Sequence, residues 1–73
     1  MSKGLATIKV SDDIIKVTTP YHERFIADLK DCIPVEDRIW NPDEVVWEVS
    51  SEWYLETEEI VSRYFNLRVE VVQ

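Results

Sequence analysis

The chain has 73 residues, 45% hydrophobic residues and a formal net charge of -7, which fits one small domain. Cys32 and His22 are the only residues of their types, and this excludes an intrachain disulfide and a zinc site of cysteines and histidines. Gly4 is the only glycine, and this excludes phosphate-binding and dinucleotide-binding loops. We expect a single domain over residues 1–73, ordered at about 6–72, with no cofactor and no metal.

The acidic charge is concentrated in the second half of the chain. Residues 31–73 hold eleven acidic and three basic side chains, and the stretch from Asp43 to Glu59 holds seven acids and no base. Such a surface repels nucleic-acid phosphates and attracts basic proteins. The alternative is that the acids only keep a small domain soluble. The clustering favours a functional role.

The apolar segments are short. The first residues contain no apolar stretch of the length that a secretory signal needs, and no run approaches the ~18 residues of a membrane span. From the sequence we therefore expect an intracellular, cytoplasmic protein that does not enter a membrane.

The first elements predicted are two strands and a helix. Residues 6–10 alternate polar and apolar side chains and residues 14–18 are rich in β-branched ones, which is typical of a hairpin with a turn at residues 11–13. Thr19 is a suitable N-cap and Pro20 a suitable first residue for a helix that runs to about Asp31. Pro34 would end it.

Two residues of this predicted helix invite chemical interpretations. His22 lies near the helix start without a nucleophile in a recognisable motif, so we interpret it as a partly packed side chain and not as a general base. Cys32 has only Lys30 as a basic neighbour, and we interpret it as a small buried hydrophobe. Without a nucleophile, a metal cluster or a cofactor loop, we do not expect an enzyme.

A second hairpin is predicted around residues 41–44, whose sequence Asn-Pro-Asp-Glu fits a type I turn. If the first and last of these face each other, Trp40 faces Val45 and Arg38 faces Trp47. Trp40 and Trp47 would then brace the sheet, with Arg38 packed on Trp47 as a cation-π contact. One side of this hairpin would carry Arg38, Trp40, Val45, Trp47 and Val49.

A second helix is predicted from about Ser51 to Phe65. Ser50 or Ser51 could cap it, and Thr57 could cap a later start. Asn66 is a suitable left-handed C-cap, and residues 67–72 alternate as a last strand. The order ββαββαβ predicts a small α+β domain with a mainly antiparallel sheet and two helices packed on it.

Scattered residues of the chain resemble a known family. Ile14 to Val17, Pro20-Tyr21, Phe25, Leu29-Lys30, Arg38-Ile39-Trp40, Trp47-Glu48-Val49 and Tyr64-Phe65 form a pattern similar to the small HARP-like domain that precedes helicase motors, which also occurs as stand-alone phage chains. The resemblance implies a non-catalytic module that helps a motor protein recognise nucleic-acid structure. It assigns family positions to Tyr21, Arg38, Trp40 and Trp47. We expect the chain to depart from the family, because these 73 residues include no motor and their second half lacks the basic residues that a nucleic-acid surface needs.

The main functional hypothesis is an acidic interaction module. One face of the second helix and the segment before it would engage a basic site on a nuclease or helicase, as an adaptor or as a phage inhibitor that mimics nucleic-acid charge. The residues expected to bind this partner are Glu44, Glu48, Glu52, Trp53, Tyr54, Glu56 and Glu59.

Two alternatives remain open at this point. The chain could bind structured or single-stranded nucleic acid directly through its basic half. The residues expected for that function are Lys9, Lys16, Arg24, Arg38 and Trp40. It could also be a homodimer that pairs through an exposed strand edge or through its tryptophans.

Overall fold

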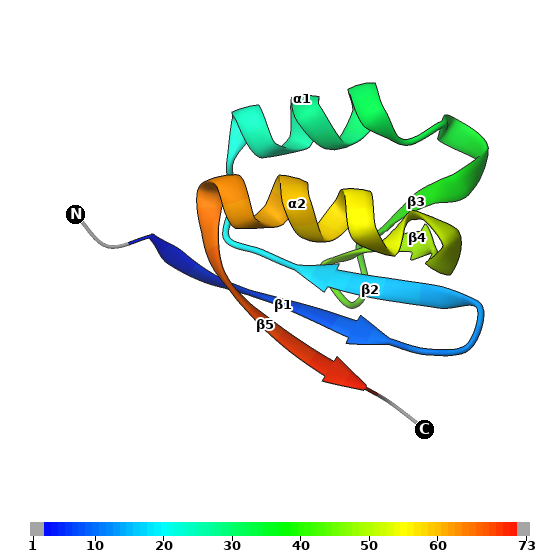
Figure 1. The fold of residues 1–73 in the computed structure, drawn as a ribbon. Coiled ribbons are helices and arrows are strands. Elements are labelled where there is room, and N and C mark those ends of the chain that lie inside the picture. Colours follow the sequence, from blue (N-terminus) through cyan, green and yellow to red (C-terminus); the bar gives the residue numbers. More distant parts are fainter. Residues whose placement is uncertain (1–2, 72–73) are drawn as a thin grey trace.

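The computed structural model describes residues 3–71, which form a five-stranded sheet with two helices on one face (Figure 1). The strand order is β3-β4-β2-β1-β5. Only β5 runs parallel to its neighbour, β1. The predicted α+β class and ββαββαβ order are therefore confirmed. The elements are β1 (Gly4–Val10), β2 (Ile14–Thr18), α1 (Glu23–Cys32), β3 (Arg38–Asn41), β4 (Val46–Ser50), α2 (Tyr54–Tyr64) and β5 (Phe65–Val71), with short 3-10 turns η1 (Val35–Asp37) and η2 (Ser51–Trp53).

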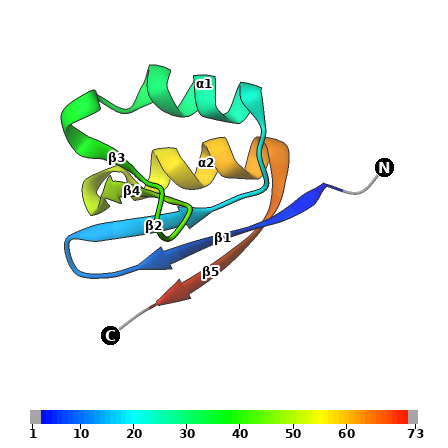
Figure 2. The same cartoon turned by 180° about the vertical axis from the view of Figure 1, so that it is seen from behind.

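The core lies between the sheet and the two helices, and the helices stay on the same side in the opposite view (Figure 2). Alternate residues of the central strands point into it, because side chains alternate across a strand. Ile8, Ile15 and Val49 meet Phe25 and Leu29 of α1 there, and all of them are buried. Within residues 3–71, no helix is long and apolar enough to cross a membrane.

The first helix begins later than predicted. Thr19 and Pro20 precede α1 in non-helical backbone, and the N-cap is His22, whose Nδ1 accepts a hydrogen bond from the Phe25 N–H at 3.2 Å. The Thr-Pro pair resembles a helix start, but here an imidazole nitrogen provides the capping acceptor. Pro34 follows the helix end as predicted, while Cys32 is exposed and Ile33 takes the buried position expected for it.

The second hairpin has a longer loop than predicted. Trp40 faces Trp47 and Arg38 faces Val49, so the expected pairs Trp40 with Val45 and Arg38 with Trp47 are wrong. The Asn41 side chain accepts hydrogen bonds from the backbone N–H groups of residues 43 and 44, and this turn extends the loop by two residues. The shift by two preserves which side chains share a face.

The second helix is preceded by η2, and Ser50 and Trp53 make no side-chain cap. The alternative cap, Thr57, is fully buried inside α2. Asn66 is not a left-handed C-cap, because the helix ends at Tyr64 and Phe65 already has extended backbone. β5 therefore begins two residues before the predicted strand, and the last predicted strand residue, Val72, lies outside the described residues.

Candidate functional site: an aromatic groove

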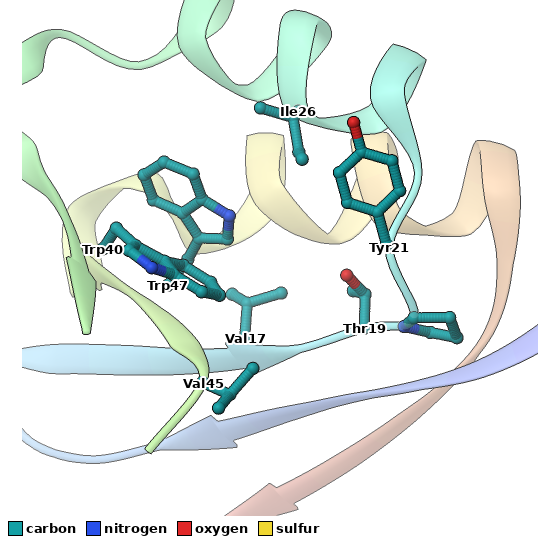
Figure 3. A pocket seen from close by; sticks show the side chains of 8 residues that line it. Val17, Thr19, Tyr21, Ile26, Trp40, Val45 and Trp47 are labelled. Carbon is teal, nitrogen blue, oxygen red and sulfur yellow. The ribbon is translucent and has the colours of Figure 1, made fainter. Parts of the chain in front are cut away.

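A concave surface lies between α1 and the second hairpin, and we call it the aromatic groove (Figure 3). It encloses about 190 Å³. In Figure 3 the Tyr21 ring stands on one side and the two tryptophan rings on the other, with Ile26 above and Val17 below. The lining is mainly apolar, with hydroxyl groups on Thr19 and Tyr21, and Lys30 borders its outer, shallower part. The lining residues are Val17, Thr19, Pro20, Tyr21, Ile26, Trp40, Val45 and Trp47.

Strand pairing and the start of α1 position the three aromatic rings. Trp40 and Trp47 face each other across β3 and β4, with ring centroids 5.3 Å apart and the planes tilted by 57°. Trp47 is 8% exposed and forms part of the core, whereas Trp40 keeps 45% of its surface exposed and Tyr21 keeps 83%. The space bordered by one buried ring and two exposed rings can accept an apolar side chain or a flat ring of a partner.

One wall of the groove has strained backbone. Val45 has a φ of 59° and is the only non-glycine residue with a positive φ among those described. A β-branched side chain in this region costs about 1 to 3 kcal/mol. The strain follows from the loop that Asn41 organises, and it holds the Val45 side chain at the groove.

Three of the expected partner-binding acids lie on α2 and in the turn before it. Glu52 and Glu59 are exposed and Glu56 is half-buried. Glu59 is paired with Arg63 at 3.1 Å, and this exposed pair contributes little to stability. We call Glu52, Glu56 and Glu59 the α2 acids.

Glu44 and Glu48 lie elsewhere. Glu48 sits between the buried Trp47 and Val49 on β4, so it points to the sheet face away from the helices, where it accepts a hydrogen bond from Asn41 at 2.8 Å. Glu44 pairs with Lys16 at 3.0 Å. The structure therefore does not join these two carboxylates to the α2 acids in one surface.

Trp53 and Tyr54 are half-buried and pack against the core, not outward among glutamates. The Trp53 indole N–H donates to Asp37 at 3.0 Å, which ties η2 to η1. The Tyr54 hydroxyl donates to Glu58 at 2.8 Å, and this bond raises the pKa of Tyr54 above its ordinary value. These hydrogen bonds fix both half-buried side chains against the domain.

The basic residues expected for nucleic-acid binding are dispersed. Lys9 and Lys16 face each other on the sheet face away from the helices, and Lys16 is neutralised by Glu44. Arg24 is exposed on α1, while the Arg38 Nε donates to the Ile33 carbonyl oxygen at 3.0 Å. Only Trp40 of this set lines the aromatic groove.

The side chains that could take part in catalysis are engaged in ring packing and hydrogen bonds within the fold. The ring of His22 packs on Tyr64 and Phe65 at centroid distances of 4.6 and 5.7 Å, so the prediction of a partly packed histidine is confirmed. Asp28 accepts a hydrogen bond from the Tyr64 hydroxyl, which raises the pKa of Tyr64. Across residues 3–71, no three His, Cys, Asp or Glu side chains are grouped as metal ligands.

Comparisons with known proteins give no match: no protein family, no curated protein and no solved structure is detectably similar to this chain.

Residues that the sequence reasoning left out of its binding sets supply much of the groove. Tyr21, Ile26 and Lys30 come from α1 and the segment before it. Ile26 and Lys30 are four residues apart and so share one side of the helix. Tyr21, Trp40 and Trp47 are among the positions on which the predicted HARP-like resemblance rests, and no comparison tests that resemblance.

Proposed function

We propose that the protein is a non-enzymatic interaction module that binds a basic protein partner and takes an apolar side chain of that partner into the aromatic groove. The observation that carries the proposal is the pair of exposed rings, Trp40 and Tyr21, over a buried apolar floor. Tryptophan and tyrosine are common energetic anchors of protein interfaces.

The class of partner follows from the charge. The net charge of -7 attracts basic proteins over distances of about a Debye length, which is ~8 Å at physiological salt. Part of this charge is carried by the α2 acids, two of which lie on α2 and one in the turn just before it. In this proposal they accelerate encounter, whereas the groove determines how long the complex lasts. A nuclease or helicase with a basic nucleic-acid site remains the partner that best fits such charge.

A second candidate function is supported by Trp40 and Lys30. An exposed indole can stack on an unpaired base, and an ammonium group near it can meet a phosphate. This function agrees with the HARP-like resemblance. It is the weaker candidate for two reasons. The lysines and arginines that were expected to bind nucleic acid lie away from the groove, and the net negative charge of the chain repels phosphates.

A titration with defined probes separates the two functions. The first probe is a set of short peptides with lysine and arginine flanking one Leu, Phe or Trp, and the second is an oligothymidine strand. We expect the peptides to perturb the NMR signals of Trp40 and Ile26 at physiological salt, and the oligonucleotide to leave them unchanged. The opposite pattern would replace the proposal by nucleic-acid binding.

Two variants separate the contribution of the groove to binding from the contribution of the acidic charge. Trp40→Ala removes the exposed anchor and should weaken the best peptide by about tenfold or more at every salt concentration. A triple Glu→Gln variant of the α2 acids should mainly slow association at low salt. If Trp40→Ala binds as the parent does while the triple variant does not bind, the α2 acids themselves are the site and the groove is not.

A further inference from the structure

We infer that the β5 edge is a self-association surface, through which two copies of the chain pair their β5 strands antiparallel about a two-fold axis. This inference goes beyond the proposed function and does not depend on it. β5 is an outer strand of the sheet, and among the described residues only β1 pairs with it. Its seven residues, Phe65–Val71, are matched one by one to β1 without a bulge.

Natural proteins usually protect an open edge with a proline, a bulge, a short strand or a covering element. β5 is long, regular and free of proline. In both ribbon views β5 runs away from the helix layer toward its C-terminal end (Figures 1 and 2). The other outer strand, β3, has only four residues, so β5 is the better template for a further strand.

The side chains of β5 form two stripes that suit a second copy. On the face that carries the helices, Val69 and Val71 follow the core-packed Leu67 and remain 42% and 73% exposed. On the opposite face lie Arg68 and Glu70, which form an exposed pair within the strand at 3.6 Å. One stripe gains from burial, and the other carries opposite charges two residues apart.

The charges favour the register centred on Val69 over the two registers that place like charges opposite each other. When the axis passes through Val69, Arg68 of each copy faces Glu70 of the other, and Leu67 faces Val71. An axis through Arg68 or through Glu70 would bring two like charges opposite each other, which destabilises a strand pair. β5 is therefore complementary to itself in the register centred on Val69, and this is the reason for naming a second copy as the occupant.

The groove stays free in such a dimer. The groove lies beside β3 and β4, at the opposite edge of the sheet from β5. The two copies would join their sheets into one, with both helix layers on the same side of the combined sheet and one groove at each far end. The dimer would thus present two equivalent grooves, which can raise the apparent affinity for a partner with repeated sites.

Charge reversal tests the register. We expect sedimentation equilibrium, measured up to about 1 mM, to show concentration-dependent dimers of the parent chain. Arg68→Glu and Glu70→Arg should each weaken the dimer by about tenfold or more, because each replaces two attractive pairs by two repulsive ones. The double variant R68E/E70R should restore it. The two single changes shift the net charge in opposite directions, so a general charge effect cannot weaken both.

Two outcomes would overturn the inference. One is a monomer at every concentration. The other is a dimer that both single variants leave intact but Trp40→Ala disrupts, which would place the contact at the groove. Circular dichroism of each variant checks the fold, and Ile39→Lys on β3 is the matched control because Ile39 is 65% exposed at the other edge.

Cross-linking gives an independent measure of the same register. In a Cys32→Ser background, Val69→Cys would place two cysteines opposite each other across the axis, where antiparallel Cα atoms are about 4.5 to 5.5 Å apart and a disulfide can form. Mild oxidation should give a covalent dimer for Val69→Cys and much less for Val71→Cys, which faces residue 67. Equal or reversed yields would contradict the register centred on Val69.

Discussion

The helix-covered face of the sheet has two unlike parts. Under α1 and α2 the apolar side chains are closed off completely, and Phe25, Leu29 and Val61 are each 0% exposed. Over β3 and β4 the rings of Trp40 and Tyr21 remain in solvent although Trp47 below them is buried. We call these the closed part and the open part. The same short chain packs one region fully, so the open part does not reflect a shortage of apolar residues.

The cause of the difference is the path of the helices. α2 packs against β1 and β5 and α1 packs against α2, whereas Trp40 of β3 keeps 45% of its surface exposed. Trp47 lies where the two parts meet, because it belongs to the core cluster and also lines the groove. Substitutions at this boundary and on each side of it therefore test whether the two parts differ as described.

The largest effect is expected for Trp47→Ala. Removing a buried ring of this size costs about 3 to 5 kcal/mol, which is a large part of the stability of a domain whose total is about 4 to 11 kcal/mol. Urea unfolding followed by circular dichroism measures the loss. A loss below about 1 kcal/mol would mean that Trp47 belongs to the open part, and that the boundary is drawn in the wrong place.

Trp53→Phe should have the next largest effect. The variant keeps an aromatic ring against the core but loses the indole N–H that binds Asp37, and we expect a loss of about 1 to 2 kcal/mol. Asp37→Asn is the control, because it keeps an acceptor oxygen for the indole. A Trp53 variant with full stability and weakened partner binding would return Trp53 to the partner-contact role that its sequence position suggested.

Val45→Asn should have a smaller effect of opposite sign on stability. Asparagine adopts positive φ more easily than a β-branched residue does, so the variant should gain about 1 kcal/mol in unfolding free energy. It also replaces an apolar groove wall by an amide, and peptide binding should weaken. Thermal unfolding and the peptide titration measure the two changes. A destabilised variant would show that the valine packing outweighs the strain.

The smallest effect is expected at alkaline pH. The hydrogen bonds to Glu58 and Asp28 raise the pKa values of Tyr54 and Tyr64 above 10.0. A tyrosine whose pKa is raised in the folded state stabilises the fold fully at a pH below its ordinary pKa. This stabilisation is lost as the pH rises through the pKa that the tyrosine has in the folded state. Stability should therefore fall above about pH 10, and less steeply in Tyr54→Phe and Tyr64→Phe. An identical fall in both variants would exclude the two tyrosines as its cause.

Much of the closed part could be predicted from the sequence. The alternation in β1 and β2, the apolar spacing around Phe25 and Leu29, and Pro34 after the first helix are local signals, and the structure agrees with each of them. The helix boundaries were less predictable, since the capping acceptor of α1 is the ring nitrogen of His22 and α2 has no side-chain cap. Tertiary packing sets those ends.

The open part was harder to foresee. The loop from residue 42 to 45 depends on two hydrogen bonds to the Asn41 side chain, and the type I turn that its sequence favours would have given another register. The groove joins residues that are more than 20 positions apart, such as Tyr21 and Trp47. Periodicity within one element carries no information about such a pairing. The sequence from Asp43 to Glu59 does contain seven acids and no basic residue. In the structure, however, the sheet separates Glu48 from the α2 acids.

The most direct test of the groove as the binding surface follows the three indole N–H signals in a two-dimensional NMR titration with the basic, apolar-centred peptides. Our expectation is that the Trp40 signal moves most with increasing peptide, that the Trp47 signal moves less, and that the signal of Trp53, which donates to Asp37, stays in place. Saturable movement of Trp53 or of the α2 amide signals, with Trp40 unchanged, would contradict it.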